Sequence, residues 1–426
     1  MTAFSIVFVL ALGLGLALRL YLYGRQLRHV AAHRSAVPEA FRERIELDAH
    51  QRAADYTLAR VRARLPDLVV GAVWLLWLTL GGLLQDIHGL VATVLEPGGL
   101  AHGVAFLSSI VLLGWVLELP FELHRVFVTE ARFGFNRMSP GLFVADTLKS
   151  AALGAVIGLP LLAGVLWLMG AMGPLWWIYV WAAWLTFNLL AMLIWPTFIA
   201  PLFNKFEPLD DTTLRERVTR LLERCGFKSK GLFVMDGSRR SAHGNAYFTG
   251  FGSAKRIVFF DTLLNRLDGD EVEAVLAHEL GHFRHGHVRK RIAVMAVLSF
   301  FVLALLGWLA GQDWFFEGLG MQARDTASLL ALFMLAMPVF MLPTTPLMSY
   351  WSRRHEYEAD SYAAAHAGAR PLITALVKLY RDNASTLTPD PWYSGFHDSH
   401  PPAALRVAHL ERIQTPASPM AAPAAA

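Results

Sequence analysis

Seven apolar stretches, each about 20 residues long, constrain this chain more than any other feature of its sequence. They fall at roughly 3–22, 68–86, 100–120, 150–172, 175–199, 291–311 and 327–350. An α-helix of about 20 apolar residues crosses the hydrocarbon core of a bilayer, which is about 30 Å thick. The composition agrees, because 55% of the residues are apolar and 17% are charged, whereas about a quarter of the residues in soluble domains are charged. We therefore expect an all-α integral membrane protein with seven transmembrane helices.

The first and the seventh stretch carry further information. The first, 3–22, has no basic residues before it and no small-residue cleavage site after it, so we expect a retained helix and not a signal peptide. The seventh contains Pro338, Pro343 and Pro346. Because proline removes a backbone donor and interrupts the helix, this span should be kinked.

Polar regions interrupt and follow the apolar stretches. The sequence thus divides into transmembrane helices one to five (1–200), an insert (201–290), transmembrane helices six and seven (291–350), a tail (351–413) and a low-complexity end (414–426). We expect the Pro- and Ala-rich end to be disordered. The single Cys225 allows no internal disulfide, and we expect it to be an inert buried thiol.

Basic residues alternate from one connecting loop to the next. Loops 23–67 and 121–149 carry nine and four Lys or Arg residues, whereas 87–99 and the 173–174 turn carry none and 312–326 carries one. Basic loops remain on the cytoplasmic side of a membrane. We therefore expect the N-terminus outside, and both the insert and the tail in the cytoplasm on the same face.

The arginines lie beside apolar stretches, so lipid headgroups are their expected partners and nucleic acid is not. Arginine outnumbers lysine 31 to 7, which is typical of GC-rich bacterial genomes. A bacterial source would place the chain in the cell inner membrane, and a eukaryotic source in the endoplasmic reticulum membrane.

The polar regions predict a few elements of their own. Segment 38–66 has a helical period with many arginines and should form a cytosolic surface helix. In the insert, a helix should begin with Asp268 or Asp270 as its N-cap. Short strands should precede it at 232–235, 246–251 and 256–260.

That helix contains the H-E-x-x-H motif His278-Glu279-Leu280-Gly281-His282. Residues four apart lie on one helical face, so His278 and His282 can bind a single zinc ion. Glu279 lies at the edge of that face, where its carboxylate can take a proton from a water at the open position of the metal as the water attacks a peptide carbonyl. The sequence therefore predicts one Zn²⁺ per chain, with Glu279 as general base.

A catalytic zinc needs a third protein ligand. We expect it in the segment that follows the seventh stretch, where Glu356 and Asp360 are four apart and share a face. Glu356 can bind zinc while Asp360 orients a ligating histidine. The alternative for Glu356 is an ion pair with Arg353 or Arg354. Glu358 points nearly opposite to Glu356 and should be solvated.

Two further histidines follow the motif, and neither is an expected ligand. His285 shares the face of the two motif histidines, but seven residues of helix rise about 10.5 Å, too far for one ion. The metzincin continuation is excluded, because it needs Gly at 285 and His at 288 and the chain has His285 and Val288. We expect His285 and His287 to be surface or interfacial.

With its HExxH motif and seven apolar stretches, the chain resembles the type I CAAX prenyl endopeptidase family. Members of this family are seven-span integral-membrane zinc metallopeptidases with HExxH. The matching segments follow one another in order along most of the chain. They are YGRQLRHV, VPEAFRERIELDAHQRAADYT, FVTEARFGFNRMSPGLFVADTLK, SAHGNAYFTGF, RIVFFDTLL, HELGH, SRRHEYEAD and WYSGFHDSHPPAALR. Although HExxH alone is shared with many peptidases, the ordered set is specific.

The resemblance implies a fold and further site residues. The seven helices would form a barrel around a large chamber, with a zincin-like cytosolic insert that carries a small β element. Asn245 and His400 would lie beside the metal and hold the substrate backbone or the oxyanion, and Arg406 would support the site. Without the resemblance, Asn245 would be a turn residue and His400 a loop residue before two prolines.

The family's reaction is the removal of the last three residues from prenylated CAAX proteins. The resemblance therefore implies a peptide or protein substrate, lipidated or not, that lies at the membrane. The alternative is a broad-specificity membrane quality-control metalloprotease. A transporter is disfavoured because the apolar stretches hold almost no ionisable residues apart from Glu118. A non-catalytic scaffold is disfavoured because the expected ligands and base are all present.

The alternation of loop charges predicts how each loop can be labelled. Single cysteines placed at positions 95 and 320 should react with a membrane-impermeant reagent added from outside only. Reaction of either from the cytoplasmic side would contradict the seven-span arrangement.

Overall fold

The computed structural model describes residues 1–229, 231–249 and 256–414 of the chain, so the disorder expected for the end of the chain concerns residues outside the described part. The chain divides into two compact units, each made of three segments. We call the first the membrane unit; it consists of Met1–Gly24, Ala59–Ile194 and Arg291–Thr345. We call the second the polar unit; it consists of Arg25–Leu58, Trp195–Lys290 and Pro346–Ala426.

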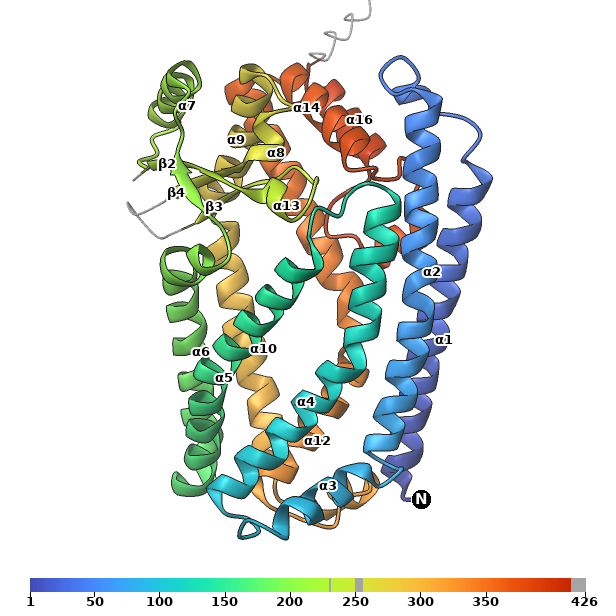
Figure 1. Ribbon diagram of the computed structural model, residues 1–426, viewed down its shortest axis with the longest axis vertical. Helices are drawn as coiled ribbons and strands as arrows, with labels where there is room; N and C mark the ends of the chain where they lie inside the picture. Colours follow the sequence, from blue (N-terminus) through green and yellow to red (C-terminus); the bar gives the residue numbers. More distant parts are fainter. Residues whose placement is uncertain (230, 250–255, 415–426) are drawn as a thin grey trace, which may run out of the picture. The chain divides into compact units, whose positions relative to one another are not determined.

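Long helices make up the membrane unit (Figure 1). Those that lie wholly or partly in it are α1 (Ala3–Ala32), α2 (Leu47–Leu78), α3 (Leu83–Ala92), α4 (Leu100–His124), α5 (Pro140–Ala171), α6 (Trp176–Ile194), α10 (His287–Leu309), α11 (Asp313–Gly318) and α12 (Thr326–Met341). The helix expected over 38–66 begins at Leu47 and is continuous with the apolar stretch that follows it, since Leu47–Leu78 is one unbroken helix.

Five helical segments of the described chain are each long and apolar enough to cross a membrane alone. Two bent pairs bring the number of candidate spans to seven, namely α2 with α3, bent by 54°, and α12 with α13 (Thr344–Ala367), bent by 65°. The second bend falls next to Pro343, where the sequence predicts a kink. The expected class, a mostly helical integral membrane protein with a small sheet, is confirmed.

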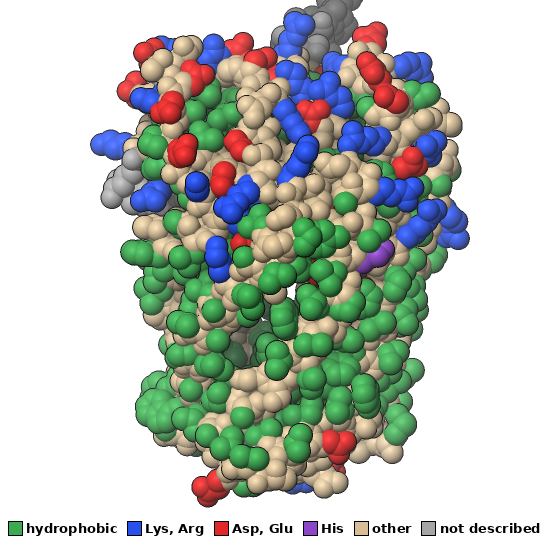
Figure 2. Space-filling model, viewed as in Figure 1, with side chains coloured by type: hydrophobic (Ala, Val, Ile, Leu, Met, Phe, Trp, Pro, Cys, Tyr) green, Lys and Arg blue, Asp and Glu red, His purple; other side chains and the backbone are tan. Residues whose placement is uncertain are grey.

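The membrane unit is apolar both inside and outside. Its interior is a cluster of buried side chains that includes Phe8, Phe106 and Phe316. Large apolar side chains such as Val156 and Trp115 are exposed on its helices, and apolar side chains cover these helices on the face drawn in Figure 2. Exposed apolar surface of this extent is costly in water and is expected where lipid surrounds a helix.

The polar unit contains the sheet and the shorter helices. Its helices are α7 (Thr212–Arg224), α8 (Asp261–Leu264), α9 (Gly269–Arg284), most of α13, α14 (Ala369–Asp382), α15 (Pro391–His397) and α16 (Ala403–Gln414). Its strands are β1 (Phe206–Pro208), β2 (Gly231–Met235), β3 (Ala246–Thr249) and β4 (Arg256–Phe260).

The four strands form one sheet in the order β1-β2-β4-β3. β2 and β4 pair in parallel, and the two outer strands pair antiparallel to them. The three strands expected from the sequence are present, but residues 250 and 251 of the expected 246–251 lie outside the described part. β1 was not predicted, because three residues with the pattern Phe-Glu-Pro give no strand signal. β3 lies at one edge of the sheet, which leaves its outer side available for pairing.

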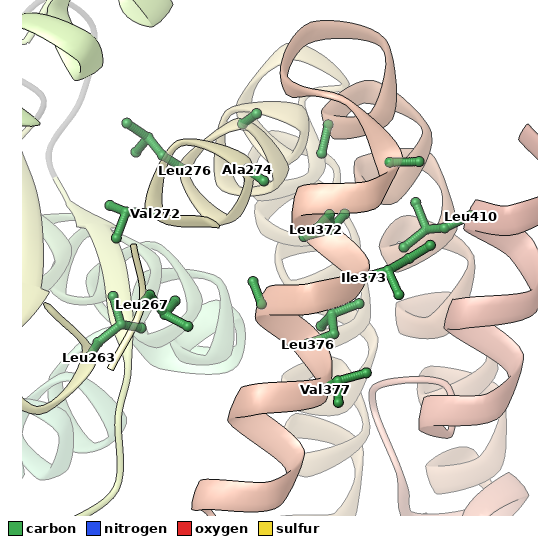
Figure 3. Packing of buried hydrophobic residues seen from close by; sticks show 14 of the residues in the cluster. Leu263, Leu267, Val272, Ala274, Leu276, Leu372, Ile373, Leu376, Val377 and Leu410 are labelled. Carbon is green, nitrogen blue, oxygen red and sulfur yellow. The ribbon is translucent and has the colours of Figure 1, made fainter. Parts of the chain in front are cut away.

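A hydrophobic core holds the helices of the polar unit together. Figure 3 shows Leu372, Leu376 and Val377 on α14 packed between side chains of α8 and α9 on one side and α16 on the other. This core fixes the position of α9 and α16, which carry site residues described below.

One detail of the membrane unit affects the labelling experiment. Gly320 has a φ of +80°, and an added Cβ would lie 2.5 Å from the carbonyl oxygen of Thr79. A cysteine at 320 would therefore distort the loop. Gln322, two residues on, is exposed and is the better position for the label.

Candidate metal and catalytic site

Helix α9 carries the H-E-x-x-H motif, and its first turn is strongly fixed. The side chain of Asp268 accepts hydrogen bonds from the backbone N–H groups of Asp270 and Glu271, and Glu271 accepts one from the N–H of Asp268 in return. This reciprocal arrangement is a capping box. Lys378 of α14 also donates to the Glu271 carboxylate at 2.7 Å. The helix thus begins where the sequence predicts, with Asp268 as its cap.

Close approach of α9 to α13 brings the metal-binding candidates together. At Gly281, the fourth residue of the motif, an added Cβ would lie 2.9 Å from the Cα of Ala359. Any larger residue would push the two helices apart. The glycine therefore allows His278 and His282 on α9 to face Glu356 on α13.

His278, His282 and Glu356 form a nearly equilateral triangle of donor atoms. The two histidine Nε2 atoms are 3.3 Å apart, and each lies 3.4 Å from a carboxylate oxygen of Glu356. Ligands bound at about 2.0–2.1 Å around a tetrahedral ion are separated by roughly 3.3 Å. Glu356 Oε2 is buried and has no hydrogen-bond partner among the described residues. These donors fit one divalent metal ion, and the alternative pairing of Glu356 with Arg353 or Arg354 does not occur.

Asp360 orients the first of these histidines. Its Oδ1 lies 2.8 Å from His278 Nδ1, so it accepts the Nδ1 proton and leaves the Nε2 lone pair directed at the triangle. Arg406 of α16 donates to the same carboxylate, with Nε 2.9 Å from Oδ2. Asp360 is 0% exposed and Arg406 is 6% exposed. Asp360 and Arg406 therefore lie on the Nδ1 side of the His278 ring.

Charges around the triangle shift the pKa values of its histidines in opposite directions. Burial alone would lower the pKa of His278, but the neighbouring Asp360 and Glu356 carboxylates outweigh it and raise that pKa to about 9. Burial and the charge of His278 lower the pKa of His282 to about 3. His282 is therefore neutral and ready to bind metal, whereas below about pH 9 a metal ion must displace the His278 proton.

His282 has an orienting chain of its own, which the sequence analysis missed. His282 Nδ1 lies 2.9 Å from His287 Nδ1, and His287 Nε2 lies 2.9 Å from Glu358 Oε2. If His287 donates its Nε2 proton to Glu358, its Nδ1 accepts from His282 and leaves His282 Nε2 free for metal. His287 is 3% exposed and stacks on His355. Of the two positions expected for His287, surface or interfacial, its burial against His355 and Glu358 excludes the surface. Glu358, expected to be solvated, pairs with His287. His285 is exposed, as expected.

A cavity of about 340 Å³ opens beside the triangle. Its lining includes His278, Glu279, Glu356, Asn245 and His400. Burial is the largest influence on the Glu279 carboxyl and raises its pKa above the ordinary value. The sequence-predicted residues from four different segments therefore meet at one cavity in the polar unit.

Asn245 and His400, which were named through the family resemblance, both line this cavity. Asn245 directly precedes β3 and is exposed. His400 Nε2 lies 3.4 Å from Glu356 Oε1, and His400 Nδ1 lies 3.0 Å from the Ser399 hydroxyl. Neither position was derivable from spacing, because both residues come from loops.

Comparisons with known proteins agree with this geometry. The family model of the CAAX prenyl protease N-terminal segment, with five membrane helices, matches residues 26–205, and that of peptidase family M48 matches residues 208–414. The CAAX prenyl protease 1 homolog of Oryza sativa subsp. japonica is 37% identical over 315 residues, which cover 73% of each chain. CAAX prenyl protease 1 of Saccharomyces cerevisiae is 37% identical over 331 residues, covering 74% of this chain and 73% of that one. The chain belongs to the type I CAAX prenyl endopeptidase family.

A solved structure supports the same assignment. The crystal structure of S. mikatae Ste24p matches with a TM-score of 0.89 at 29% identity, over 96% of this chain and 99% of that one. As a member of the type I CAAX prenyl endopeptidase family, the chain is a multi-pass membrane metalloendopeptidase. The M48 family implies a metal cofactor, and the donor triangle described above fits one.

Asn383, which lies outside the family-matching segments of the sequence, holds the backbone next to Asn245 in place. The side-chain amide oxygen of Asn383, at the end of α14, lies 3.1 Å from the N–H of Gly244, and its amide nitrogen lies 3.4 Å from the Gly244 carbonyl. Asn383 therefore fixes the backbone immediately before Asn245. It follows an amphipathic helix and is 138 residues from Asn245, so no local pattern indicates this contact.

We expect replacement of His287 by leucine to weaken metal binding by about 10–100-fold, the usual effect of removing a partner that orients a ligand. The reason is that His282 loses the acceptor that fixes its tautomer. Metal affinity would be measured by competition with a chromophoric chelator. His285→Leu is the matched control, because His285 is exposed and should leave the affinity unchanged. An unchanged affinity in His287→Leu would contradict the orienting role.

Proposed function

We propose that this chain is a zinc-dependent endopeptidase that cleaves peptide bonds near the C-terminus of prenylated CAAX-type or other membrane-associated polypeptides. The donor triangle of His278, His282 and Glu356 next to a glutamate-lined cavity is the observation that carries the proposal. Two imidazoles and one carboxylate are the ligand set of many zinc peptidases and leave one position open. When bound, zinc supplies a Lewis acid that makes water nucleophilic at neutral pH.

The remaining roles belong to residues of the chain. Glu279, which shares the cavity with two of the ligands, takes a proton from the attacking water and returns it to the leaving amine. Asn245 and His400 hold the substrate backbone or the developing oxyanion. Asp360 and Arg406 act through His278, because both are buried and both contact its Nδ1. They are positioning residues.

The edge of the sheet offers a way to hold the peptide. β3 directly follows Asn245 and is an outer strand of the sheet. An extended substrate can pair with such an edge through main-chain hydrogen bonds, which do not depend on side-chain identity. This mode suits substrates with varied C-terminal sequences.

The proposal also includes a lipidated substrate and a site on one side of the membrane. Relatives named CAAX prenyl protease 1 occur in several eukaryotes, which motivates lipidated substrates. The lipid would rest among apolar membrane helices, where each buried CH₂ contributes roughly 0.8 kcal/mol. We infer from the loop charges that the site faces the cytoplasm. The labelling experiment at positions 95 and 322 tests that orientation.

We expect Glu279→Gln to retain zinc and to lose at least about 10³-fold in turnover, within the range for loss of a general base. The purified protein would be incubated with a prenylated and an unprenylated peptide of the same sequence, and mass spectrometry would identify the products. Release of the last three residues from the prenylated peptide alone supports CAAX processing. Equal cleavage of both peptides at many bonds would support the quality-control alternative, and wild-type turnover by Glu279→Gln would exclude Glu279 as the base.

Strand pairing makes a separate prediction about the substrate. N-methylation of a backbone nitrogen next to the scissile bond should reduce cleavage sharply, because it removes a main-chain donor. Asn245→Ala should reduce turnover while zinc content stays at the wild-type value. Cleavage of the N-methylated peptide at the parent rate would rule out strand pairing.

A further inference from the structure

A second cluster of metal-binding side chains lies in the membrane unit and has no part in the chemistry proposed above. It consists of His88 on α3, His102 in the first turn of α4, and Asp325, which directly precedes α12. One ligand atom from each residue lies within 4.8 Å of the other two. His102 is 0% exposed and His88 is 7% exposed. The cluster therefore connects three helices through two buried histidines and one partly buried carboxylate.

His102 is held in the state that binds a metal. Its Nε2 lies 3.2 Å from the carbonyl oxygen of His88 and donates its proton there. The lone pair is then on Nδ1, which is buried and has no hydrogen-bond partner among the described residues. A ligating histidine commonly donates its other ring N–H to a backbone carbonyl in this way. Leaving a buried acceptor without a partner is costly, so the site calls for an occupant.

Asp325 supplies a fixed carboxylate. Its Oδ1 accepts the N–H of Ser328 at 2.7 Å and caps α12, while its Oδ2 lies 2.7 Å from His88 Nε2. The preceding loop is also fixed, because the Gln85 side chain accepts the N–H of Gln322 at 2.8 Å. Within the described chain, His88 is the one ion-pair partner of Asp325. No arginine or lysine there compensates the carboxylate.

The surroundings of the two histidines are apolar. Phe106, itself 0% exposed, contacts the edge of His88 at 5.3 Å and stacks on His102 at 6.4 Å between ring centroids. An apolar shell around polar donors restricts water and strengthens metal coordination. The donor set, two imidazoles and one carboxylate, has the same composition as the triangle in the polar unit.

We propose that His88, His102 and Asp325 bind a second divalent transition-metal ion, of the zinc type, that clamps α3, α4 and α12 together. Nitrogen and carboxylate donors suit Zn²⁺ and Co²⁺ better than Ca²⁺ or Mg²⁺, which prefer oxygen alone. Binding replaces the His88 Nε2 proton by the ion. The donors, which lie within 4.8 Å of one another, must close to the separation of roughly 3.3 Å found around a tetrahedral ion.

The number of bound ions tests this proposal. The full-length protein in detergent is stripped with a chelator, reloaded with Zn²⁺ or Co²⁺, freed of excess ion and analysed for metal per chain. The wild type should bind two equivalents. Asp325→Asn should bind one, because asparagine can still cap α12 through its amide oxygen but carries no charge. His124→Gln is the control, since His124 is an exposed histidine on the same helix α4 and should leave two equivalents.

Variants of the polar unit separate the two sites. Glu356→Ala should retain one equivalent, and Glu356→Ala combined with Asp325→Asn should retain none. Zn²⁺ should raise the melting temperature of Glu356→Ala but not that of the double variant. One equivalent in the wild type, or two in Asp325→Asn, would overturn the proposal and leave a hydrogen-bonded cluster without metal. The number of ions bound by the wild-type chain tests the proposal without any variant. The test therefore remains possible even if Asp325→Asn does not fold.

Discussion

The site depends on one buried carboxylate, that of Asp360. It accepts the Nδ1 proton of His278 and the guanidinium of Arg406, and it is 0% exposed. These three residues come from α13, α9 and α16, so a single charged group connects three helices of the polar unit. Removing one partner from a buried ion pair typically costs about 3–5 kcal/mol, because the remaining charge is left uncompensated. The orientation of His278, and with it the donor triangle, follows from this network.

Much of the site could be predicted from the sequence because it depends on helical spacing. Four residues separate His278 from His282 and Glu356 from Asp360, and in a helix this spacing places both members of each pair on one face. The cap at Asp268 and the kink near Pro343 were predicted for the same reason: their signals lie within a few residues. The apolar membrane helices were predictable because bilayer thickness fixes the length of an apolar span.

The parts that could not be predicted depend on contacts between distant segments. His287 was expected to be surface or interfacial, but its partner Glu358 lies 71 residues later, so no local pattern indicates their pairing. Asn383 reaches back 139 residues to Gly244. His88 and Asp325 are 237 residues apart, and each lies in a loop between apolar stretches, where no local pattern connects them. Asn245 and His400 were named through the family resemblance, since a loop residue has no periodicity that shows where it points.

The central claim is that His278, His282 and Glu356 hold one catalytic zinc ion. The most direct measurement is X-ray diffraction from crystals of the active protein at wavelengths on either side of the zinc absorption edge. The account predicts an anomalous peak at about 2.0–2.2 Å from His278 Nε2, His282 Nε2 and a carboxylate oxygen of Glu356. A zinc peak coordinated by His285, or an active protein with no peak between these three side chains, would contradict it.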